Sequence, residues 1–234
     1  MINPEAEREV NRLINVLKEL GVKFKSLIVF GSAARAEGFK PGVSDVDVLV
    51  VVDSITDKLR EAERIVGKPL ELGFITPWQL QELWSSGDPL VHMLWREGVA
   101  VVDDGFFTRL KSKGKPEVTE YTVMKLRFWG LKDLAKAMKP GVDRASGLRS
   151  LHHAIRNFAR ARIAREKGVF AITDLEVEEN LNPQVLPRYR DFMSRLKRNM
   201  EYYEQLILEA LDVAEAVDGK PLPKIHEIMS CCEA

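Results

Sequence analysis

The sequence predicts a mixed α/β domain, with a sheet of about four strands and flanking helices, followed by an all-α helical bundle. Over the first half of the chain, short apolar runs rich in β-branched residues alternate with amphipathic helical patterns, whereas beyond residue 116 every periodic segment is helical. A chain of 234 residues is long enough for two such domains. We therefore assign residues 1–112 to the first domain, 117–220 to the second and 221–234 to a tail.

Caps and residue periodicity locate the elements of the first domain. A helix over residues 3–20 begins at Asn3, a candidate cap, with Pro4 in the first helical position. Strands are expected at Ser26–Phe30, Asp45–Val52, Leu70–Ile75 and Val99–Val102, and helices at Lys58–Val66, 76–84 and Pro89–Arg96. The second strand is nearly continuous in β-branched residues, which is typical of a strand buried on both faces.

The polar segment Lys111–Pro116 contains Gly and Pro, has no apolar periodicity, and is expected to link the two domains. Beyond it, amphipathic helices are expected over residues 117–138, 143–167, 173–188 and 190–217, the third of them interrupted by Pro183 and Pro187. Three or four helices of this length can close a bundle of their own.

Composition excludes several classes of protein. Lys and Arg (35) balance Asp and Glu (35), so no overall field draws the chain to nucleic acid or an anionic membrane. No apolar run is long enough to cross a bilayer, and the N-terminal segment does not have the pattern of a signal peptide. The only cysteines, Cys231 and Cys232, are adjacent and provide no disulfide framework. We expect a cytoplasmic protein without a membrane partner; the sequence leaves its oligomeric state open, a homo-oligomer included.

A candidate phosphate-binding turn follows the first predicted strand at Gly31 and Ser32. Gly31 lacks a Cβ, which would let a phosphate approach the backbone, and Ser32 adds a hydroxyl. Residues 33–37 are good helix formers, and a helix beginning there would direct free N–H groups and a positive dipole at the phosphate.

Asp45 and Asp47 lie two residues apart at the start of an apolar strand, so their side chains leave the same face. Two carboxylates so close repel each other, and a divalent cation such as Mg²⁺ or Mn²⁺ would remove that cost through oxygen ligands. The alternative is that both aspartates lie in solvent at the strand edge.

Together, Gly31-Ser32 after a strand and Asp45-Val46-Asp47 opening the next one resemble the signature of the DNA polymerase β-like nucleotidyltransferase superfamily. Arg35, Glu37 and Ser44 fall where the minimal nucleotidyltransferases of the MntA antitoxin type have similar residues, although Ala36 replaces a usual Gly and residues 38–42 lengthen the loop. This resemblance covers about residues 5–105. The helical domain more loosely resembles that of kanamycin nucleotidyltransferase and the HEPN family. No histidine has the upstream arginine of the HEPN ribonucleases, which argues against that activity.

The resemblance implies roles for individual residues. Asp45 and Asp47 would hold metal, Gly31 and Ser32 would hold the β- and γ-phosphates, and Glu71 is the candidate third acid, for metal binding or for catalysis. The alternative for Glu71 is a solvent-facing side chain in its strand. Arg35 either contacts phosphate or is a solvated helix residue.

The predicted function is a Mg²⁺-dependent nucleotidyltransferase that moves NMP from a nucleoside triphosphate, AMP from ATP in the first instance, to a hydroxyl acceptor. That acceptor is a protein side chain, a small molecule or an RNA end. The alternative is a non-catalytic nucleotide-binding regulatory module, antitoxin-like, that acts through its helical domain. A basic helix face, containing His152, His153, Arg149, Arg156, Arg160 and Arg162, is either solvated or helps bind a polyanion.

Overall fold

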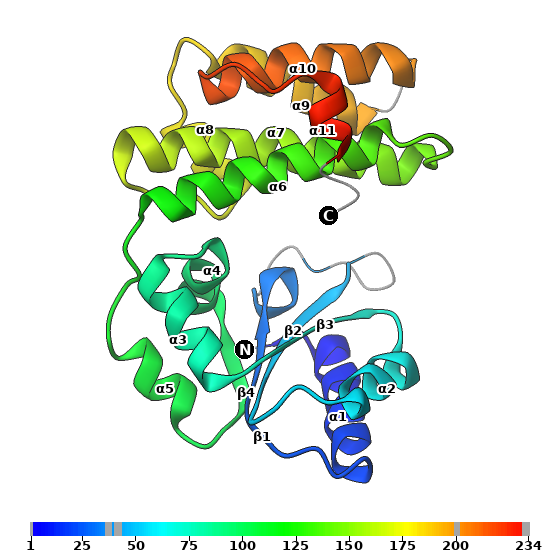
Figure 1. Cartoon of the computed structure of the whole chain (residues 1–234), viewed down its shortest axis with the longest axis vertical. Coiled ribbons are helices and arrows are strands. Elements are labelled where there is room, and N and C mark those ends of the chain that lie inside the picture. Colours follow the sequence, from blue (N-terminus) through cyan, green and yellow to red (C-terminus); the bar gives the residue numbers. More distant parts are fainter. Residues whose placement is uncertain (1, 36–38, 40–43, 199–201, 231–234) are drawn as a thin grey trace. The chain divides into compact units, whose positions relative to one another are not determined.

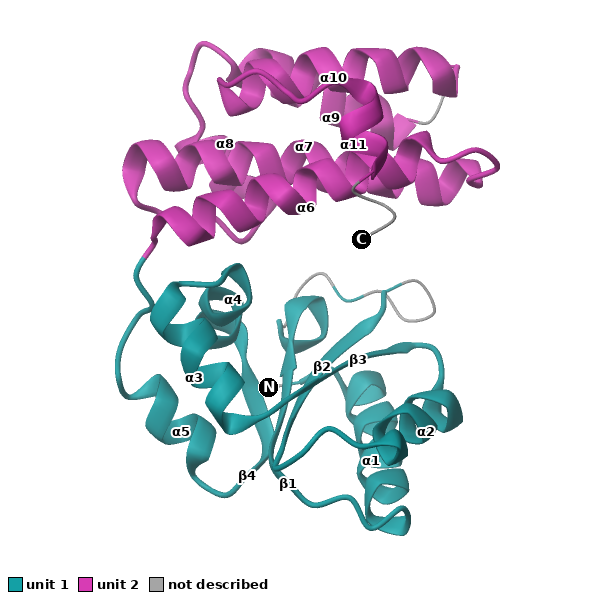
Figure 2. Ribbon diagram, viewed as in Figure 1, with its two compact units in different colours: residues 1–117 teal, residues 118–234 magenta. Residues whose placement is uncertain are grey.

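The computed structural model describes residues 2–35, 39, 44–198 and 202–230 (Figure 1). Ala36, Glu37 and both cysteines lie outside the described residues. The chain divides into two compact units, Met1–Glu117 and Val118–Ala234 (Figure 2).

The first unit is built on a four-stranded sheet of order β3-β2-β1-β4. The strands are β1 (Phe24–Phe30), β2 (Val46–Val52), β3 (Leu70–Ile75) and β4 (Val99–Asp103). β1 pairs antiparallel with β2 and with β4, whereas β2 and β3 are parallel. The helix α2 (Asp57–Val66) provides the crossover that two parallel strands require. Together with the helical second unit, this mixed sheet confirms the predicted fold class.

Helices cover both faces of the sheet (Figure 1). One face packs against α1 (Pro4–Glu19) and α2, and the other against α3 (Pro77–Ser86), α4 (Pro89–Glu97) and α5 (Phe106–Lys111). Central strand β2 supplies both cores by alternation, with Val48 and Val50 in the first and Leu49 and Val51 in the second. The expected caps are present: Asn3 accepts a hydrogen bond from the Glu5 N–H at 3.0 Å, as a helix-capping side chain does.

The helix expected after Gly31 and Ser32 is absent from the described residues. A short 3₁₀ turn, η1 (Gly31–Ala34), is found instead, and Arg35 leaves it with extended backbone (φ −101°, ψ 143°). The Arg35 N–H returns to the Ser32 carbonyl at 3.2 Å, which closes the turn instead of propagating a helix. The argument from a helix dipole at this point is therefore wrong.

The second unit is entirely helical in its described part. It contains α6 (Glu120–Met138), α7 (Arg144–Lys167), α8 (Asp174–Asn180), α9 (Leu186–Arg198), α10 (Tyr203–Asp218) and α11 (Ile225–Ser230). α6 and α7 can approach closely because Gly130 of α6 has no side chain. A Cβ at this position would lie only 2.9 Å from the Phe158 ring of α7. Phe158, Tyr189 and Phe192 are fully buried in the core that these helices share.

Helix boundaries in this unit differ from expectation. The segment 173–188 is split between α8 and α9, with Pro183 in the connection and Pro187 in the first turn of α9, where proline is tolerated. Residues 190–217 are likewise divided between α9 and α10. Residues 221–234, expected to be a tail, contain α11, whose Ile228 is buried against the bundle core. No helix in the described ranges is long and apolar enough to cross a membrane.

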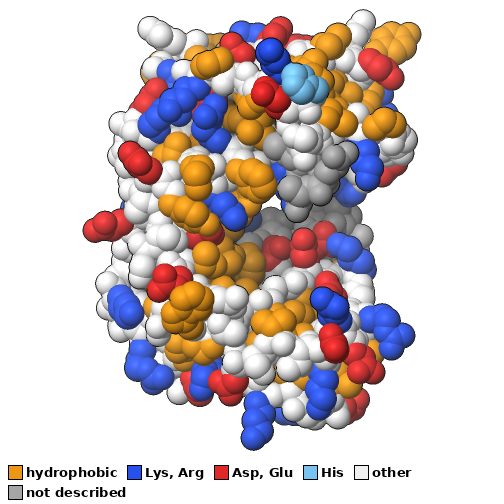
Figure 3. Space-filling view, in the orientation of Figure 1, with side chains coloured by type: hydrophobic (Ala, Val, Ile, Leu, Met, Phe, Trp, Pro, Cys, Tyr) orange, Lys and Arg blue, Asp and Glu red, His pale blue; other side chains and the backbone are white. Residues whose placement is uncertain are grey.

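Three arginines of the predicted basic face of α7 are held by contacts within the unit, whereas Arg149 and His153 of the same face are exposed. Arg160 is only 6% exposed and donates to the Ile172 carbonyl. Arg156 pairs with Asp174 at 3.3 Å and Arg162 with Glu166 at 2.7 Å. These arginines therefore serve contacts within the unit. On the face seen in Figure 3, positive and negative side chains are interspersed over each unit, as the zero net charge leads one to expect.

Asp218, the last residue of α10, is fully buried and joins three helices. Its carboxylate accepts hydrogen bonds from Arg127 Nε of α6 at 2.7 Å and from Arg165 Nη1 of α7 at 3.2 Å. The Arg165 guanidinium also donates to the Asp218 carbonyl. The α10 C-terminus is thus held to the α6–α7 pair by charge-assisted hydrogen bonds.

We expect Asp218→Ala to lower the free energy of unfolding by about 3 kcal/mol, because it leaves two partly buried guanidinium groups without their carboxylate. Urea denaturation followed by circular dichroism measures this. Asp212→Ala, at an exposed position of the same helix, should stay within about 0.5 kcal/mol of the unmodified protein. Equal effects of the two substitutions would contradict the role assigned to Asp218.

Candidate active site

The candidate site lies where β1 ends and β2 and β3 begin. Because β1 runs antiparallel to β2 and β2 runs parallel to β3, these three ends meet at one edge of the sheet. The register pairs Phe30 with Asp47 and Asp47 with Glu71. The sheet therefore brings the turn at Gly31 and two of the predicted acids together.

Asp47 and Glu71 extend from the same face of the sheet. Asp47 alternates with Leu49 and Val51, and Glu71 with Gly73 and Ile75, on the side covered by α3, α4 and α5. Gly73 does not leave room for a ligand on this face: a Cβ there would lie 3.1 Å from Cδ1 of Leu49, so the Leu49 side chain fills the space.

Gly31 has a positive φ of 68° that favours glycine. A Cβ at this position would overlap Oδ2 of Asp47 and lie 3.3 Å from its Cγ. The missing side chain thus admits the Asp47 carboxylate to the turn, whereas the sequence had suggested only the approach of a phosphate.

Asp47 lies in a strongly unfavourable environment for a charged carboxylate. Burial, and then the negative charges of Glu71, Asp45 and Glu97, raise its pKa to about 7, against the opposing effect of Arg35. In the absence of a cation, Asp47 therefore binds a proton close to neutral pH. Such a perturbed acid, next to other acids, is typical of a functional site.

Asp45 precedes β2 and is more exposed, at 46% of its side chain. Its Oδ1 accepts a hydrogen bond from Lys68 Nζ at 2.9 Å. Ser32 lies within η1 and is partly exposed. Both residues are thus located at the same edge as Asp47, although Asp45 faces a lysine in this structure.

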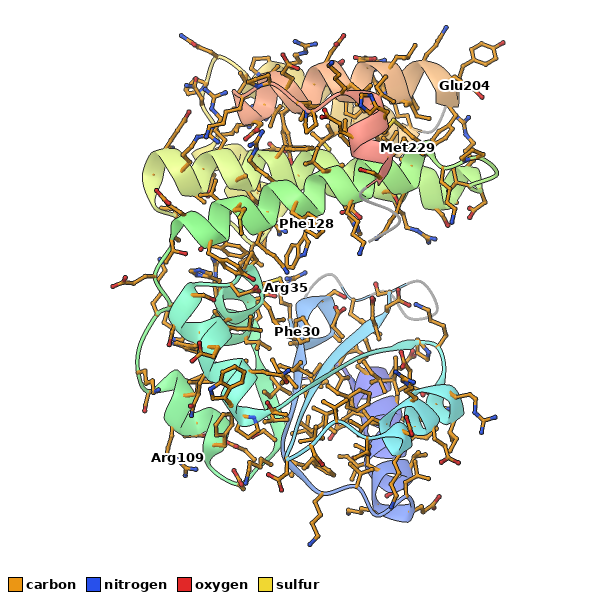
Figure 4. All side chains as sticks on the ribbon, viewed as in Figure 1. Phe30, Arg35, Arg109, Phe128, Glu204 and Met229 are labelled. Carbon is orange, nitrogen blue, oxygen red and sulfur yellow. The ribbon has the colours of Figure 1, made fainter. Side chains whose placement is uncertain are left out.

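Arg35 forms an ion pair that the sequence analysis missed. Its Nη1 donates to Glu97 Oε1 at 2.5 Å, and Figure 4 shows Arg35 at the same end of β1 as Phe30. Glu97 is the last residue of α4, where the helix dipole disfavours a negative charge. That unfavourable placement is the one sequence signal that could have singled out Glu97.

The donor set fits a divalent cation. No group of three or more His, Cys, Asp or Glu side chains in the described residues is arranged to hold a metal ion. Mg²⁺, however, is usually bound through one or two carboxylates together with substrate phosphates and water. Asp47, whose pKa is raised by burial and then by the neighbouring negative charges, and its pair partner Glu71 offer oxygen donors of this kind.

Part of the chain matches a known protein family. Residues 10–83, which include η1, β2 and β3, match the family described as nucleotidyltransferase domain. This match supports the prediction of a transferase enzyme. No curated protein sequence matches the chain.

Two solved structures are similar to this chain. One is the spectinomycin adenyltransferase AAD(9) from Enterococcus faecialis, with ATP and spectinomycin, at 16% identity and a TM-score of 0.59, covering 91% of this chain and 98% of that chain. It shows that the fold is shared. The other is a nucleotidyltransferase-like protein from Exiguobacterium sibiricum 255-15, at 18% identity and a TM-score of 0.35, covering 91% of this chain and 74% of that chain.

We expect Gly31→Ala to lower the free energy of unfolding by about 2–4 kcal/mol, because it combines backbone strain with overlap against Asp47. Gly67→Ala is the matched control: Gly67 also has positive φ (54°), but a Cβ there meets no described atom within 4 Å. Chemical denaturation of both variants separates strain from overlap. If both lose the same stability, Asp47 does not occupy the space at Gly31.

Proposed function

We propose that this protein is a Mg²⁺-dependent nucleotidyltransferase that moves NMP from a nucleoside triphosphate to a hydroxyl acceptor, with AMP from ATP as the first case. The observation that carries this proposal is the pairing of Asp47 with Glu71 beside the Gly31 turn. It lies within the span that matches a nucleotidyltransferase domain.

Each residue of the edge has a chemical task in this proposal. Gly31 and Ser32 hold the terminal phosphates through backbone N–H groups and a hydroxyl, and Arg35 adds a guanidinium. Asp45 and Asp47 would hold Mg²⁺. For the ion to bind, the hydrogen bond from Lys68 to Asp45 has to break. The ion would offset the charge that develops on the α-phosphate and on pyrophosphate.

Glu71 is the proposed general base, or the third metal ligand. The acceptor oxygen attacks the α-phosphorus, a new P–O bond forms, and the bond to pyrophosphate breaks. The hydroxyl proton passes to the Glu71 carboxylate, and pyrophosphate leaves with the electron pair of the broken bond. Glu71 is suited to this task because it extends from the same face as Asp47.

We propose a small polyhydroxylated molecule as the first acceptor to examine. The similar structure of AAD(9) was determined with ATP and spectinomycin. A zero net charge also argues mildly against a long nucleic acid as acceptor.

A second candidate is an antitoxin-like module of the MntA type that binds nucleotide without turnover and acts through a HEPN-like helical unit. The ion pair between Asp45 and Lys68 favours this candidate, because Asp45, one of the proposed metal ligands, already binds a lysine. The two candidates differ in whether any acceptor becomes labelled.

The test is incubation of the protein with Mg²⁺ and each α-³²P-labelled nucleoside triphosphate. The acceptor arms are aminocyclitols and aminoglycosides, a cell extract containing proteins, and short RNA. Label transferred to an acceptor supports the enzyme and identifies its acceptor class. Nucleotide binding without transfer in any arm supports the regulatory module.

Asp47→Asn should reduce transfer by about 10²–10³-fold, because a metal ligand is lost while the side-chain volume is kept. Without metal, its free energy of unfolding at pH 8 should equal or exceed that of the unmodified protein, since a repelling charge has been removed. Asp53→Asn, just beyond the other end of β2, is the control and should retain full transfer. Full transfer by Asp47→Asn would overturn the metal assignment.

Glu71→Gln should slow transfer by about 10²-fold or more, the usual effect of losing a general base. Equilibrium binding of Mg²⁺·ATP should change by less than about threefold, because the amide keeps the shape of the side chain. Glu61→Gln, an exposed position on α2, serves as the control. Binding lost in parallel with transfer would instead indicate that Glu71 acts as a metal ligand.

A further inference from the structure

Glu97 is an unexpected residue to find buried. Its side chain is only 7% exposed, and its Oε2 atom is buried with no hydrogen-bond partner among the residues that the structure describes. Burying a carboxylate is unfavourable unless it is paired, and the C-terminal end of a helix adds a further unfavourable field. The residue therefore needs a compensating interaction.

Packing of α4 brings Glu97 to the candidate site. α4 contacts both β1 and η1, the strand and the turn that carry Phe30 and Gly31. Gly98 ends the helix, and a Cβ there would overlap the Leu94 carbonyl. The chain can therefore turn into β4 directly after Glu97, which leaves this carboxylate at the last position of the helix, within reach of Arg35.

The compensating interaction is the ion pair with Arg35. Oε1 of Glu97 accepts a hydrogen bond from Arg35 Nη1 at 2.5 Å, while the Arg35 side chain remains 37% exposed. Guanidinium carries five N–H donors in a rigid fork, so one hydrogen bond to Glu97 leaves others available. Arg35 is thus anchored on one side and open to solvent on the other.

We propose that Glu97 is a positioning residue that holds the Arg35 guanidinium beside Asp47 for contact with the triphosphate. This inference rests on the proposed function. Arg35 follows a short turn and has extended backbone, so no helix restrains its side chain. Fixing a long side chain before binding removes an entropic cost that binding would otherwise include. A role as metal ligand fits Glu97 less well, because the guanidinium already occupies its Oε1.

The test compares Glu97→Ala, Glu97→Gln, Arg35→Ala and the double variant Arg35→Ala/Glu97→Ala. We expect Glu97→Ala to raise both KM and the calorimetric Kd for Mg²⁺·ATP about 10-fold, the usual size of a charge-assisted interaction, with kcat within about threefold. Glu97→Gln, which keeps an oxygen acceptor, should recover part of this loss. The double variant should bind no more weakly than Arg35→Ala, because the two residues act as a unit.

Glu209→Ala is the matched control. It breaks a comparable ion pair of the second unit, in which both Arg195 guanidinium nitrogens bind Glu209 at 2.6 Å, and it should leave KM and Kd unchanged. Circular dichroism verifies folding, and Glu97→Gln keeps the test open if Glu97→Ala does not fold.

Three results would overturn the inference: unchanged nucleotide binding by Glu97→Ala, tighter binding by that variant, or additive losses in the double variant. Tighter binding would mean that Glu97 holds Arg35 away from the phosphates. Absence of nucleotide binding by the unmodified protein would instead refute the proposed function, so the two failures can be told apart.

Discussion

Repulsion among carboxylates at one edge of the sheet is the constraint on which the candidate site depends. β2 lies between β1 and β3, and its parallel register with β3 pairs Asp47 with Glu71. Asp47 cannot leave this position without shifting the apolar residues that follow it, because a one-residue slip would exchange the two faces of the strand. The apolar pattern of β2 therefore fixes the position of the Asp47 carboxylate. Cations must compensate for the negative charge at this position.

The compensation is divided between two cationic side chains. Lys68 binds Asp45 at the exposed position, and the charge of Arg35 opposes the rise in the pKa of Asp47, which is half-buried. An exposed ion pair with lysine contributes little stability and exchanges readily, which suits Asp45 as a proposed metal ligand. The arginine is anchored by Glu97 and so stays near the turn. This edge of the sheet thus combines Lys68, whose exposed ion pair can exchange, with Arg35, which is held by Glu97. Such a combination fits the proposed binding of an anionic substrate together with a metal ion.

Much of the fold follows from local sequence, and the exceptions have physical causes. Strand β2 and the cap at Asn3 depend on β-branched content and on a capping side chain, which are local properties. Period-two alternation within β3 places Glu71 on the same face as Gly73 and Ile75, which is also a local property. The turn η1 was missed because helix propensity after Gly31 is overridden by the need to close against Asp47. The Leu49 side chain fills the space beside Gly73. Local sequence does not predict this, because it depends on packing between neighbouring strands.

Glu97 and Lys68 illustrate a different limit. Each lies far along the sequence from its partner, 62 residues in one case and 23 in the other, so no short motif contains both members of the pair. A motif that begins at the Gly31 turn therefore includes Arg35 but not Glu97, the residue that binds it. A glutamate at the C-terminal end of a helix, followed at once by a glycine that cannot carry a side chain, is locally unfavourable. Where such a residue is also buried, as Glu97 is, a cation distant in the sequence compensates for its charge, so local electrostatic conflict in a sequence can point to a site that motif spacing does not reveal.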